Sequence, residues 1–371
     1  MHILVTADTL GGVWTYTREL VTGLVRRGLR VTLVSFGDIP SAAQTRWLDP
    51  FPQVDFRPTA FRLEWMQDSE ADLEASSIFL QQVIDEVRPD LLHLSQFYYG
   101  ALTCDVPRLV IAHSDVLSWW AAVHHHPPAE SAWLRWYRDV VGRGIACATT
   151  VAAPTHWMLS QIERHYGKPE RTAVVYNGRT PSLFNPHVTK EDTIVTVGRL
   201  WDAGKNARLL LREDMPAPVH IVGADRHPEW QSSAFSGDEI RNNVHLDPHQ
   251  DENHLGQFFA RAAIYAATSR YEPFGLAPVE AALSRCALVA SDIASFRELW
   301  EGAAVFFRND DPSDLRSKLE QLVRDPGLRA RYGNLAYNHA RRRFSAARMI
   351  DQYLDLYHSL RGATVLNEPA A

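Results

Sequence analysis

The stretch TIVTVGRLWDAGKN, residues 193–206, decides how this chain is organised. It begins with a continuous run of β-branched residues that ends at Gly198, which is the pattern of a strand buried on both faces of a parallel sheet. Comparable apolar runs lie on both sides of it along the chain, with helix-period segments between most of them. One strand–helix series is therefore complete before residue 193, and a second series starts there.

Twelve apolar runs predict strands, six in each half of the chain. They cover residues 2–7, 30–36, 91–95, 108–114, 149–153, 172–177, 193–199, 218–224, 243–248, 263–269, 287–292 and 303–307. Alternation of such strands with helices is typical of an α/β fold, and 371 residues exceed the roughly 250–300 at which one hydrophobic core stops growing. We therefore predict two doubly wound, Rossmann-like domains facing across a cleft, over residues 1–182 and 183–345.

The composition and charge argue against several classes of protein. A hydrophobic share of 46% and a charged share of 22% are ordinary for a globular enzyme and do not fit a disordered chain. The net charge of −6 is spread without long runs of one sign, so we expect no nucleic-acid binding, and contact with a membrane surface has no positive support. The chain has no apolar run near ~18 residues, no secretion signal at its start and only three cysteines, which form no CxxC pair; these features predict a cytoplasmic protein.

The segment EPFGLAPVE, residues 272–280, carries two glutamates on a predicted strand-to-helix junction. Pro278 suits the first turn of the helix, and Gly275 and Leu276 would present backbone N–H groups to a phosphate or a sugar hydroxyl. Glu280 would lie in the first or second turn, where its carboxylate can accept hydrogen bonds from a vicinal diol such as ribose. Taken alone, the segment is better explained by a solvated helix residue and a loop charge.

A second segment adds two cations to the same sheet edge. Gly198 ends the predicted strand at 193–199, and Arg199 and Lys205 follow it. Arginine offers a planar fork and lysine a point charge, so the two are suited to holding a diphosphate. On their own they would be read as exposed surface cations, but together with residues 272–280 they favour a binding site.

The first half of the chain offers weaker signals. The pair Gly11-Gly12 follows the first strand and lets a backbone approach a ligand closely, but the GxGxxG of a dinucleotide loop is absent. The segment IAHSDVLSWW, residues 111–120, places His113 and Asp115 after another strand, where a functional and a structural role are equally well supported. Three consecutive histidines at 124–126 have the chemistry to bind metal, but an exposed loop before two prolines explains them better.

Taken together, these pieces resemble the retaining GT-B glycosyltransferases of family 4 over nearly the whole chain. The matching pieces are Gly-Gly at 11–12, His-Ser-Asp at 113–115, Tyr-Asn-Gly at 176–178, G-R-L-x4-K-N at 198–206 and E-P-F-G-L-x3-E-A at 272–281. The last piece is the family's paired-glutamate signature. Its combination with the spacing of Arg199 and Lys205 is specific, whereas Gly-Gly and Tyr-Asn-Gly alone are weak signals.

The resemblance implies that the second domain binds a nucleotide diphosphate sugar. Arg199 and Lys205 are similar to the cationic pair that stabilises the charge on the leaving diphosphate. Glu280 is similar to the ribose ligand, and Glu272 to the carboxylate that contacts the donor sugar. The residues implied to bind the donor are Gly12, Gly198, Arg199, Lys205, Glu272, Phe274, Gly275, Leu276 and Glu280.

The resemblance implies that the first domain binds the acceptor. His113 is similar to the histidine that touches the donor sugar near its C6 hydroxyl, and it joins Glu272, Arg199 and Lys205 as a candidate catalytic residue. A C-terminal helix at about 346–362 is implied to cross back and pack on this domain. The candidate acceptor contacts are Trp14, Tyr16, Tyr98, Asp115, Trp119 and the loop at 124–126.

The resemblance also implies a reaction that retains the sugar's configuration and requires no metal or other cofactor. No Asp-x-Asp motif follows a strand, and two fixed cations with a helix N-terminus would stabilise the leaving group instead. The leaving phosphate oxygen would take the acceptor's proton, so no separate base is required. No residue in the sequence indicates which nucleotide base the donor carries. We favour a UDP-sugar, followed by GDP-mannose. The acceptor (a glycan, a lipid-linked sugar or a small molecule) and the oligomeric state stay open.

Two alternatives to this function stay open. A catalytically silent nucleotide-sugar-binding protein would keep Arg199, Lys205 and Glu280 without turnover. Another GT-B enzyme, such as a nucleotide-sugar epimerase or a phosphorylase, would share the fold, although no lysine lies in an obvious pyridoxal phosphate motif. Thr180 stands two residues after Asn-Gly, where the family often has aspartate, so the role of that aspartate is not carried over.

Overall fold

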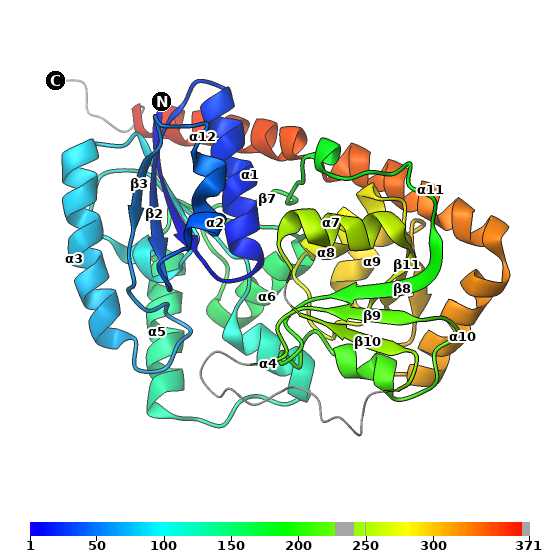
Figure 1. Cartoon of the computed structure of the whole chain (residues 1–371). Coiled ribbons are helices and arrows are strands. Elements are labelled where there is room, and N and C mark those ends of the chain that lie inside the picture. Colours follow the sequence, from blue (N-terminus) through cyan, green and yellow to red (C-terminus); the bar gives the residue numbers. More distant parts are fainter. Residues whose placement is uncertain (227–240, 249, 366–371) are drawn as a thin grey trace. The chain divides into compact units, whose positions relative to one another are not determined.

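The computed structural model describes residues 1–226, 241–248 and 250–365 of the chain (Figure 1). It divides into two compact units. Unit 1 comprises Met1–Ser118, His126–Gly178 and the segment from Ala346 onward, and unit 2 comprises Trp119–His125 and Arg179–Ser345. Each unit is built on one sheet of parallel strands with helices, so the predicted α/β fold class is confirmed.

Unit 1 contains a seven-stranded sheet in which all neighbouring strands are parallel. Its strands are β1 (His2–Asp8), β2 (Arg30–Phe36), β3 (Asp55–Pro58), β4 (Leu91–Leu94), β5 (Arg108–Ile111), β6 (Thr150–Ala153) and β7 (Thr172–Val174). Their order in space is β3-β2-β1-β4-β5-β6-β7, so the direction of winding reverses between β1 and β4. In open sheets of this kind, ligands bind beyond the carboxyl ends of the strands at the reversal.

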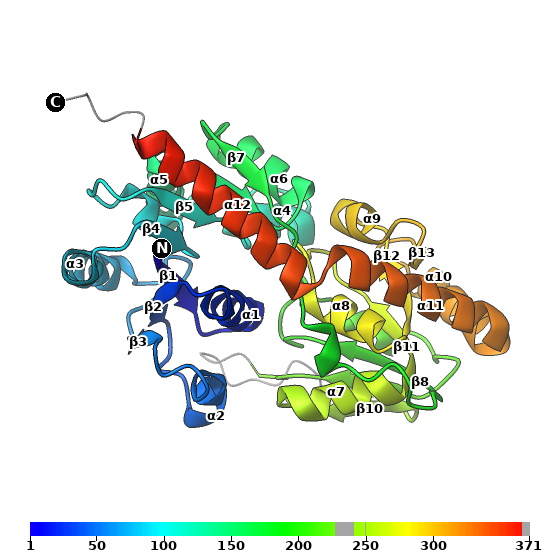
Figure 2. The ribbon, with the colours of Figure 1, turned by 90° about the horizontal axis from the view of Figure 1, so that it is seen from above.

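Helices α1 (Gly12–Arg26) and α12 (Ala346–Val365) lie side by side on one face of this sheet (Figure 2). The helices approach closely because Gly23 has no side chain: a Cβ atom there would lie 2.4 Å from Cγ1 of Ile350. The buried face of α12 includes Met349, Tyr353 and Tyr357. The C-terminal helix is thus part of the hydrophobic core of unit 1.

The other face of the sheet carries a second core. Alternate residues of β1 separate the two, since Leu4 lies in one cluster and Ile3 and Val5 in the other. Helices α3 (Glu70–Val87), α5 (Ala132–Cys147) and α6 (His156–Tyr166) supply the second core. The shorter helices of unit 1 are α2 (Ala42–Thr45), η1 (Arg46–Leu48) and η2 (Tyr98–Ala101). Helix α4 (Val116–His124) begins in unit 1, and its residues from Trp119 onward belong to unit 2.

The twelve strands predicted from the sequence are all present, within a few residues of their expected bounds. One strand, β3, was missed. It is four residues long, lies at the edge of the sheet next to β2 and ends in Pro58. Proline within a short polar run argues against a central strand, but an edge strand tolerates it because one side needs no hydrogen-bonding partner.

Unit 2 contains a six-stranded parallel sheet in the order β10-β9-β8-β11-β12-β13. Its strands are β8 (Glu191–Val197), β9 (Val219–Val222), β10 (Val244–Asp247), β11 (Ala262–Ala267), β12 (Ala287–Ser291) and β13 (Val305–Phe307). Its helices are η3 (Pro181–Leu183), η4 (Ala207–Leu211), α7 (Glu252–Arg261), α8 (Leu276–Leu283), α9 (Ala294–Trp300), α10 (Pro312–Arg324) and α11 (Pro326–Arg343). The winding reverses between β8 and β11, which places the expected ligand position of this unit at the ends of those two strands.

Candidate functional site

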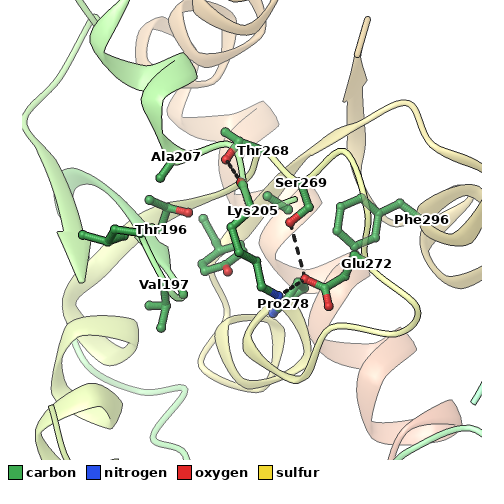
Figure 3. Close-up of a pocket in the computed structure, with 13 residues that line it drawn as sticks. Thr196, Val197, Lys205, Ala207, Thr268, Ser269, Glu272, Pro278 and Phe296 are labelled. Atoms are coloured by element: carbon green, nitrogen blue, oxygen red, sulfur yellow. Dashed lines mark hydrogen bonds and ion pairs between the residues drawn. The ribbon is translucent and has the colours of Figure 1, made fainter. Parts of the chain in front are cut away.

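The predicted donor-binding residues of unit 2 lie beyond the ends of β8 and β11. These strands are parallel neighbours, so the segments that follow them leave the same edge of the sheet. The segments line a small pocket, whose wall includes Gly198, Lys205 and Glu272 (Figure 3). The tertiary structure therefore brings together two motifs that are far apart in the sequence, at the reversal point of the sheet.

Lys205 and Glu272 point toward each other in this pocket (Figure 3). The distance from Lys205 Nζ to Glu272 Oε2 is 2.5 Å, and Ser269 Oγ donates a hydrogen bond to the same carboxylate oxygen at 3.4 Å. Both charged side chains are largely buried, with exposed fractions of 25% and 12%. The lysine charge is thus balanced by a carboxylate, and an anionic ligand in the pocket would compete with Glu272 for it.

Arg199 is held at the same sheet edge by a carboxylate that the sequence analysis did not single out. Its guanidinium donates to Asp202 Oδ2 at 2.8 Å and lies over the ring of Trp201, 5.2 Å from the ring centre. Asp202 is buried, and its other oxygen accepts the N–H of Gly204 at 2.8 Å. The loop is therefore organised around Asp202, which orients Arg199.

Glu280 lies in the second turn of α8 and is only 7% exposed. Its Oε1 atom lies 2.8 Å from Nε of Arg179, whose side chain is 1% exposed. The alternative that Glu280 is a solvated helix residue is therefore wrong. Its partner Arg179 was missed by the sequence analysis, because it precedes Glu280 by about a hundred residues and nothing local to it indicates a binding role.

Glycines shape the backbone of the pocket. Gly275 precedes α8 with φ of 85°, and a Cβ atom there would lie 3.0 Å from Cγ of Glu272. A Cβ atom on Gly198 would lie 3.3 Å from Cγ of Lys205. The ring of Phe274 is buried and packs against Phe344, so that residue and Leu276 would meet a ligand at this helix start through their backbone.

The predicted site residues of unit 1 lie at the end of β5 and the start of α1. His113 is partly buried, with its Nε2 atom 3.3 Å from Ser95 Oγ and its ring 4.7 Å from that of Tyr16. Burial lowers the pKa of His113 from 6.5 to about 3, so the imidazole is neutral at ordinary pH. Gly12 is exposed and opens α1 after Gly11, whose φ of 67° suits glycine.

Two family models match consecutive parts of the chain. "Glycosyltransferase Family 4" matches residues 10–183, and "Glycosyl transferases group 1" matches residues 184–339. The chain belongs to the GT4-type glycosyltransferases of GT-B fold. The family predicted from the paired glutamates and the Arg-Lys spacing is thereby confirmed.

Individual relatives and solved structures agree with this family. The lipopolysaccharide core biosynthesis mannosyltransferase LpcC of Rhizobium leguminosarum bv. viciae is 27% identical over 242 residues, which cover 57% of this chain and 68% of that protein. The sucrose-phosphate synthase structure from Thermosynechococcus elongatus has a TM-score of 0.80 at 16% identity, covering 98% of this chain and all of that one. Anabaena HepE in complex with UDP has a TM-score of 0.75 at 19% identity, covering 97% and 100%.

Three of the predicted acceptor contacts of this glycosyltransferase need correction, because their side chains are buried and engaged. The Trp14 indole donates to Gln44 O at 3.1 Å, and the Tyr16 hydroxyl lies 2.9 Å from His93 Nε2. Asp115 begins α4 by accepting the N–H groups of residues 117 and 118. A contact between these side chains and an acceptor is not supported, and each is better explained as a packing or capping residue.

The location of Trp119 also differs from the predicted one. It was expected in the first domain as an acceptor contact, but the structure assigns Trp119–His125 to unit 2. There its indole N–H donates to Asp202 Oδ1 at 3.1 Å, within the loop that carries Arg199. Trp119 therefore supports the candidate donor site of the glycosyltransferase.

Tyr98, another predicted acceptor contact, is partly buried and follows β4. Two polar residues lie beside it: Gln96 is two residues away in the sequence, and Glu64 contacts its backbone. The Glu64 carboxylate accepts the backbone N–H groups of Phe97 and Tyr98, both at 2.9 Å, and burial raises its pKa from 4.5 to about 7. Gln96 is 3% exposed, and neither its amide oxygen nor its nitrogen has a partner among the described residues. Neither residue belongs to a local motif, so no sequence signal indicated them.

His124 is the last residue of α4, and His125 and His126 follow it; all three are exposed, and the ring of His124 lies 4.2 Å from that of Trp120. The structure assigns His124 and His125 to unit 2 and not to the predicted first domain. Across the described ranges, no three His, Cys, Asp or Glu side chains come together as a set able to hold a metal ion. None of the described helices combines the length and the apolar character needed to cross a bilayer.

Proposed function

We propose that this glycosyltransferase moves a hexosyl group from a nucleotide diphosphate sugar to an acceptor, with retention of configuration and without a metal. The observation that carries the proposal is the Lys205–Glu272 pair at the reversal point of the unit 2 sheet. It places a cation and a carboxylate where a diphosphate and its sugar would meet. A catalytically silent nucleotide-sugar-binding protein is the second candidate, because the same residues are suited to binding alone.

In the proposed reaction the diphosphate replaces Glu272 as the ion-pair partner of Lys205. Lys205 and Arg199 then stabilise the charge that grows on the leaving diphosphate, while Asp202 keeps Arg199 in place. The N–H groups at the start of α8 add to this stabilisation. Glu272, released from the lysine, accepts hydrogen bonds from the hydroxyls of the donor sugar.

Neutral His113 suits the role of a hydrogen-bonding partner for the donor sugar. Because its pKa is about 3, the imidazole does not carry a charge that would oppose formation of an oxocarbenium-like sugar. Proton transfer from the acceptor to the leaving phosphate oxygen completes the exchange: the bond from the anomeric carbon to the phosphate oxygen breaks, and one to the acceptor oxygen forms. No base on this chain is assigned in that step.

The donor base is proposed from relatives and not from a residue. The Anabaena structures that resemble this chain contain UDP and UDP-glucose, which supports a UDP-sugar. The mannosyltransferase relative supports a mannosyl donor, for which GDP-mannose is the second choice. The acceptor contacts that remain proposed are Tyr98 and the loop at 124–126.

A thermal-shift screen with UDP, GDP, ADP and their sugars, with and without EDTA, tests the proposal. We expect one nucleotide family to raise the Tm by several degrees, and EDTA to change nothing. Slow release of free sugar from the matching donor would separate the enzyme from the silent binder. No response to any nucleotide contradicts the donor site, and a response lost with EDTA contradicts the metal-free reaction.

A further inference from the structure

Arg179 carries a buried charge to which the proposed reaction gives no direct role. It is the first residue of its stretch of unit 2, directly after Asn177-Gly178, and its side chain is 1% exposed. Its backbone N–H donates to Phe344 O at 2.9 Å. Arginines are almost never buried to this degree unless they are paired, so the partners of Arg179 should indicate its purpose.

Two helices of unit 2 and the residue that follows η3 contact the guanidinium group. Its Nε atom lies 2.8 Å from Glu280 Oε1 on α8, and its Nη2 atom donates to Glu252 at the start of α7. Its carbon lies 5.3 Å from the centre of the Phe184 ring. The guanidinium is planar, so the hydrogen bond to Glu252 and the contact on its face fix its orientation. The ion pair at Nε then holds the Glu280 carboxylate against a fixed positive charge.

We infer that Arg179 is a positioning residue that aims the Glu280 carboxylate at the ribose of the donor and thereby makes the site selective for ribonucleotides over 2′-deoxyribonucleotides. The inference rests on the proposed function and on the role of ribose ligand that the family resemblance implies for Glu280. It adds a residue outside the paired-glutamate motif to the donor site. It also assigns a specificity that the motif by itself does not require.

The physical basis is the geometry of a vicinal diol. A carboxylate accepts two neighbouring hydroxyls well only when its plane is held at the correct angle, and a buried carboxylate without a cation would turn toward other donors or lose its charge. A site that hydrogen-bonds a hydroxyl rejects the analogue that lacks it, because the buried acceptor is then left without a partner. Loss of Arg179 should therefore weaken the binding of ribonucleotides more than the binding of 2′-deoxyribonucleotides.

A purely structural role makes a different prediction. The backbone of Arg179 pairs with Ser345 in an isolated parallel bridge, and its side chain contacts α7 and α8, so the residue would only tie these segments together. In that case its replacement would lower the Tm and weaken both kinds of nucleotide by the same factor. The ratio of the two affinities separates the roles.

The experiment compares Arg179→Met and Arg179→Lys with the wild-type full chain by titration calorimetry. The probes are UDP with 2′-deoxy-UDP and GDP with 2′-deoxy-GDP, and the pair that binds the wild type is used. Arg329→Met is the matched control, since Arg329 also lies in unit 2, is 15% exposed and pairs with Asp192 at 2.7 Å.

We expect the wild type to prefer the ribonucleotide by about tenfold or more. Arg179→Met should reduce that preference to about twofold, with roughly tenfold weaker binding of the ribonucleotide. Arg179→Lys should give an intermediate ratio, because lysine keeps the charge but cannot hold both glutamates in a fixed plane. The control should keep the wild-type ratio.

If Arg179→Met folds and keeps the wild-type ratio of ribonucleotide to 2′-deoxyribonucleotide affinity, the inference is wrong and the proposed function is unaffected. If the methionine variant does not fold, an unchanged ratio in Arg179→Lys has the same meaning. Equal binding of both probes by the wild type also overturns it. Failure of the wild type to bind these four nucleotides and ADP overturns the inference together with the proposed function.

Discussion

The two units have the same architecture, but they hold the side chains near the reversal of their sheets in different ways. In unit 2, charged groups meet in opposite pairs: Lys205 with Glu272, and Arg199 with Asp202. Each cation at this edge is balanced by a nearby carboxylate. A site of this kind can exchange a carboxylate for a phosphate without leaving a buried charge unpaired.

Unit 1 holds a buried network of neutral groups next to the reversal of its sheet. His93 on β4 is fully buried, with its two ring nitrogens 2.9 Å from the Tyr16 hydroxyl and 2.7 Å from the Tyr357 hydroxyl. Burial lowers the pKa of both His93 and His113 to about 3. This network links β4, α1 and α12 through hydrogen bonds and ring contacts, without ion pairs.

The comparison teaches that the fold sets where a site lies and the side chains set what it does. Charge pairs suit a ligand that brings its own charge, such as a diphosphate. A neutral buried network suits a rigid scaffold, because every polar group must be satisfied internally. Three substitutions test this contrast.

The largest expected effect comes from breaking a charge pair in unit 2. Lys205→Ala should lower donor turnover by about 10²–10³-fold, because it removes a cation from the leaving diphosphate and leaves Glu272 without its partner. Initial rates of sugar release measure the effect. Lys318→Ala, which removes a lysine at the weak Asp314 pair on α10, is the control. Turnover within about threefold of the wild type would place Lys205 outside the reacting centre.

A moderate effect is expected from the neutral network in unit 1. His93→Leu should lower the free energy of unfolding at pH 7 by about 2–4 kcal/mol, since two buried tyrosine hydroxyls lose their partner. The folded pKa of His93 lies below its unfolded value, so its contribution is full above about pH 6.5 and is lost as the pH falls toward 3.

Urea denaturation at pH 7, 6 and 5 measures both consequences. Between pH 6 and pH 5, the wild type should lose about 1 kcal/mol that the His93→Leu variant does not lose. His358→Leu, which changes an exposed histidine on α12, should keep the wild-type dependence of the free energy of unfolding on pH. Equal slopes for the wild type and His93→Leu would mean that His93 is not held neutral.

The smallest expected effect concerns the contact between α1 and α12. Gly23→Ala should lower the free energy of unfolding by about 1–2 kcal/mol, because the new methyl group would overlap Ile350. Adding Ile350→Ala should relieve that overlap, so the two changes should be less than additive. Gly142→Ala on α5 is the control, since its Cβ atom would meet nothing closer than 3.9 Å and should cost no stability. If the two losses of free energy of unfolding were additive, the space between α1 and α12 would already accommodate a methyl group at residue 23.

Much of the fold was predictable because it depends on local patterns. Runs of aliphatic residues predicted the strands, and among the strands that the structure describes only β3, a short edge strand ending in Pro58, lacked the pattern. The spacing of Arg199, Lys205, Glu272 and Glu280 was enough to indicate the family. What the spacing did not provide was the partner of each residue.

The sequence by itself determined the α/β class, the family and the short motifs, because each of these is written in residues that lie near one another along the chain. Only the tertiary structure decided that Tyr16 and Asp115 are buried, that Trp119 belongs with Asp202, and that Arg179 faces Glu280. Burial and ion pairing depend on which distant segments the fold brings within a few ångströms. That proximity is a property of the packed chain, and no local pattern encodes it.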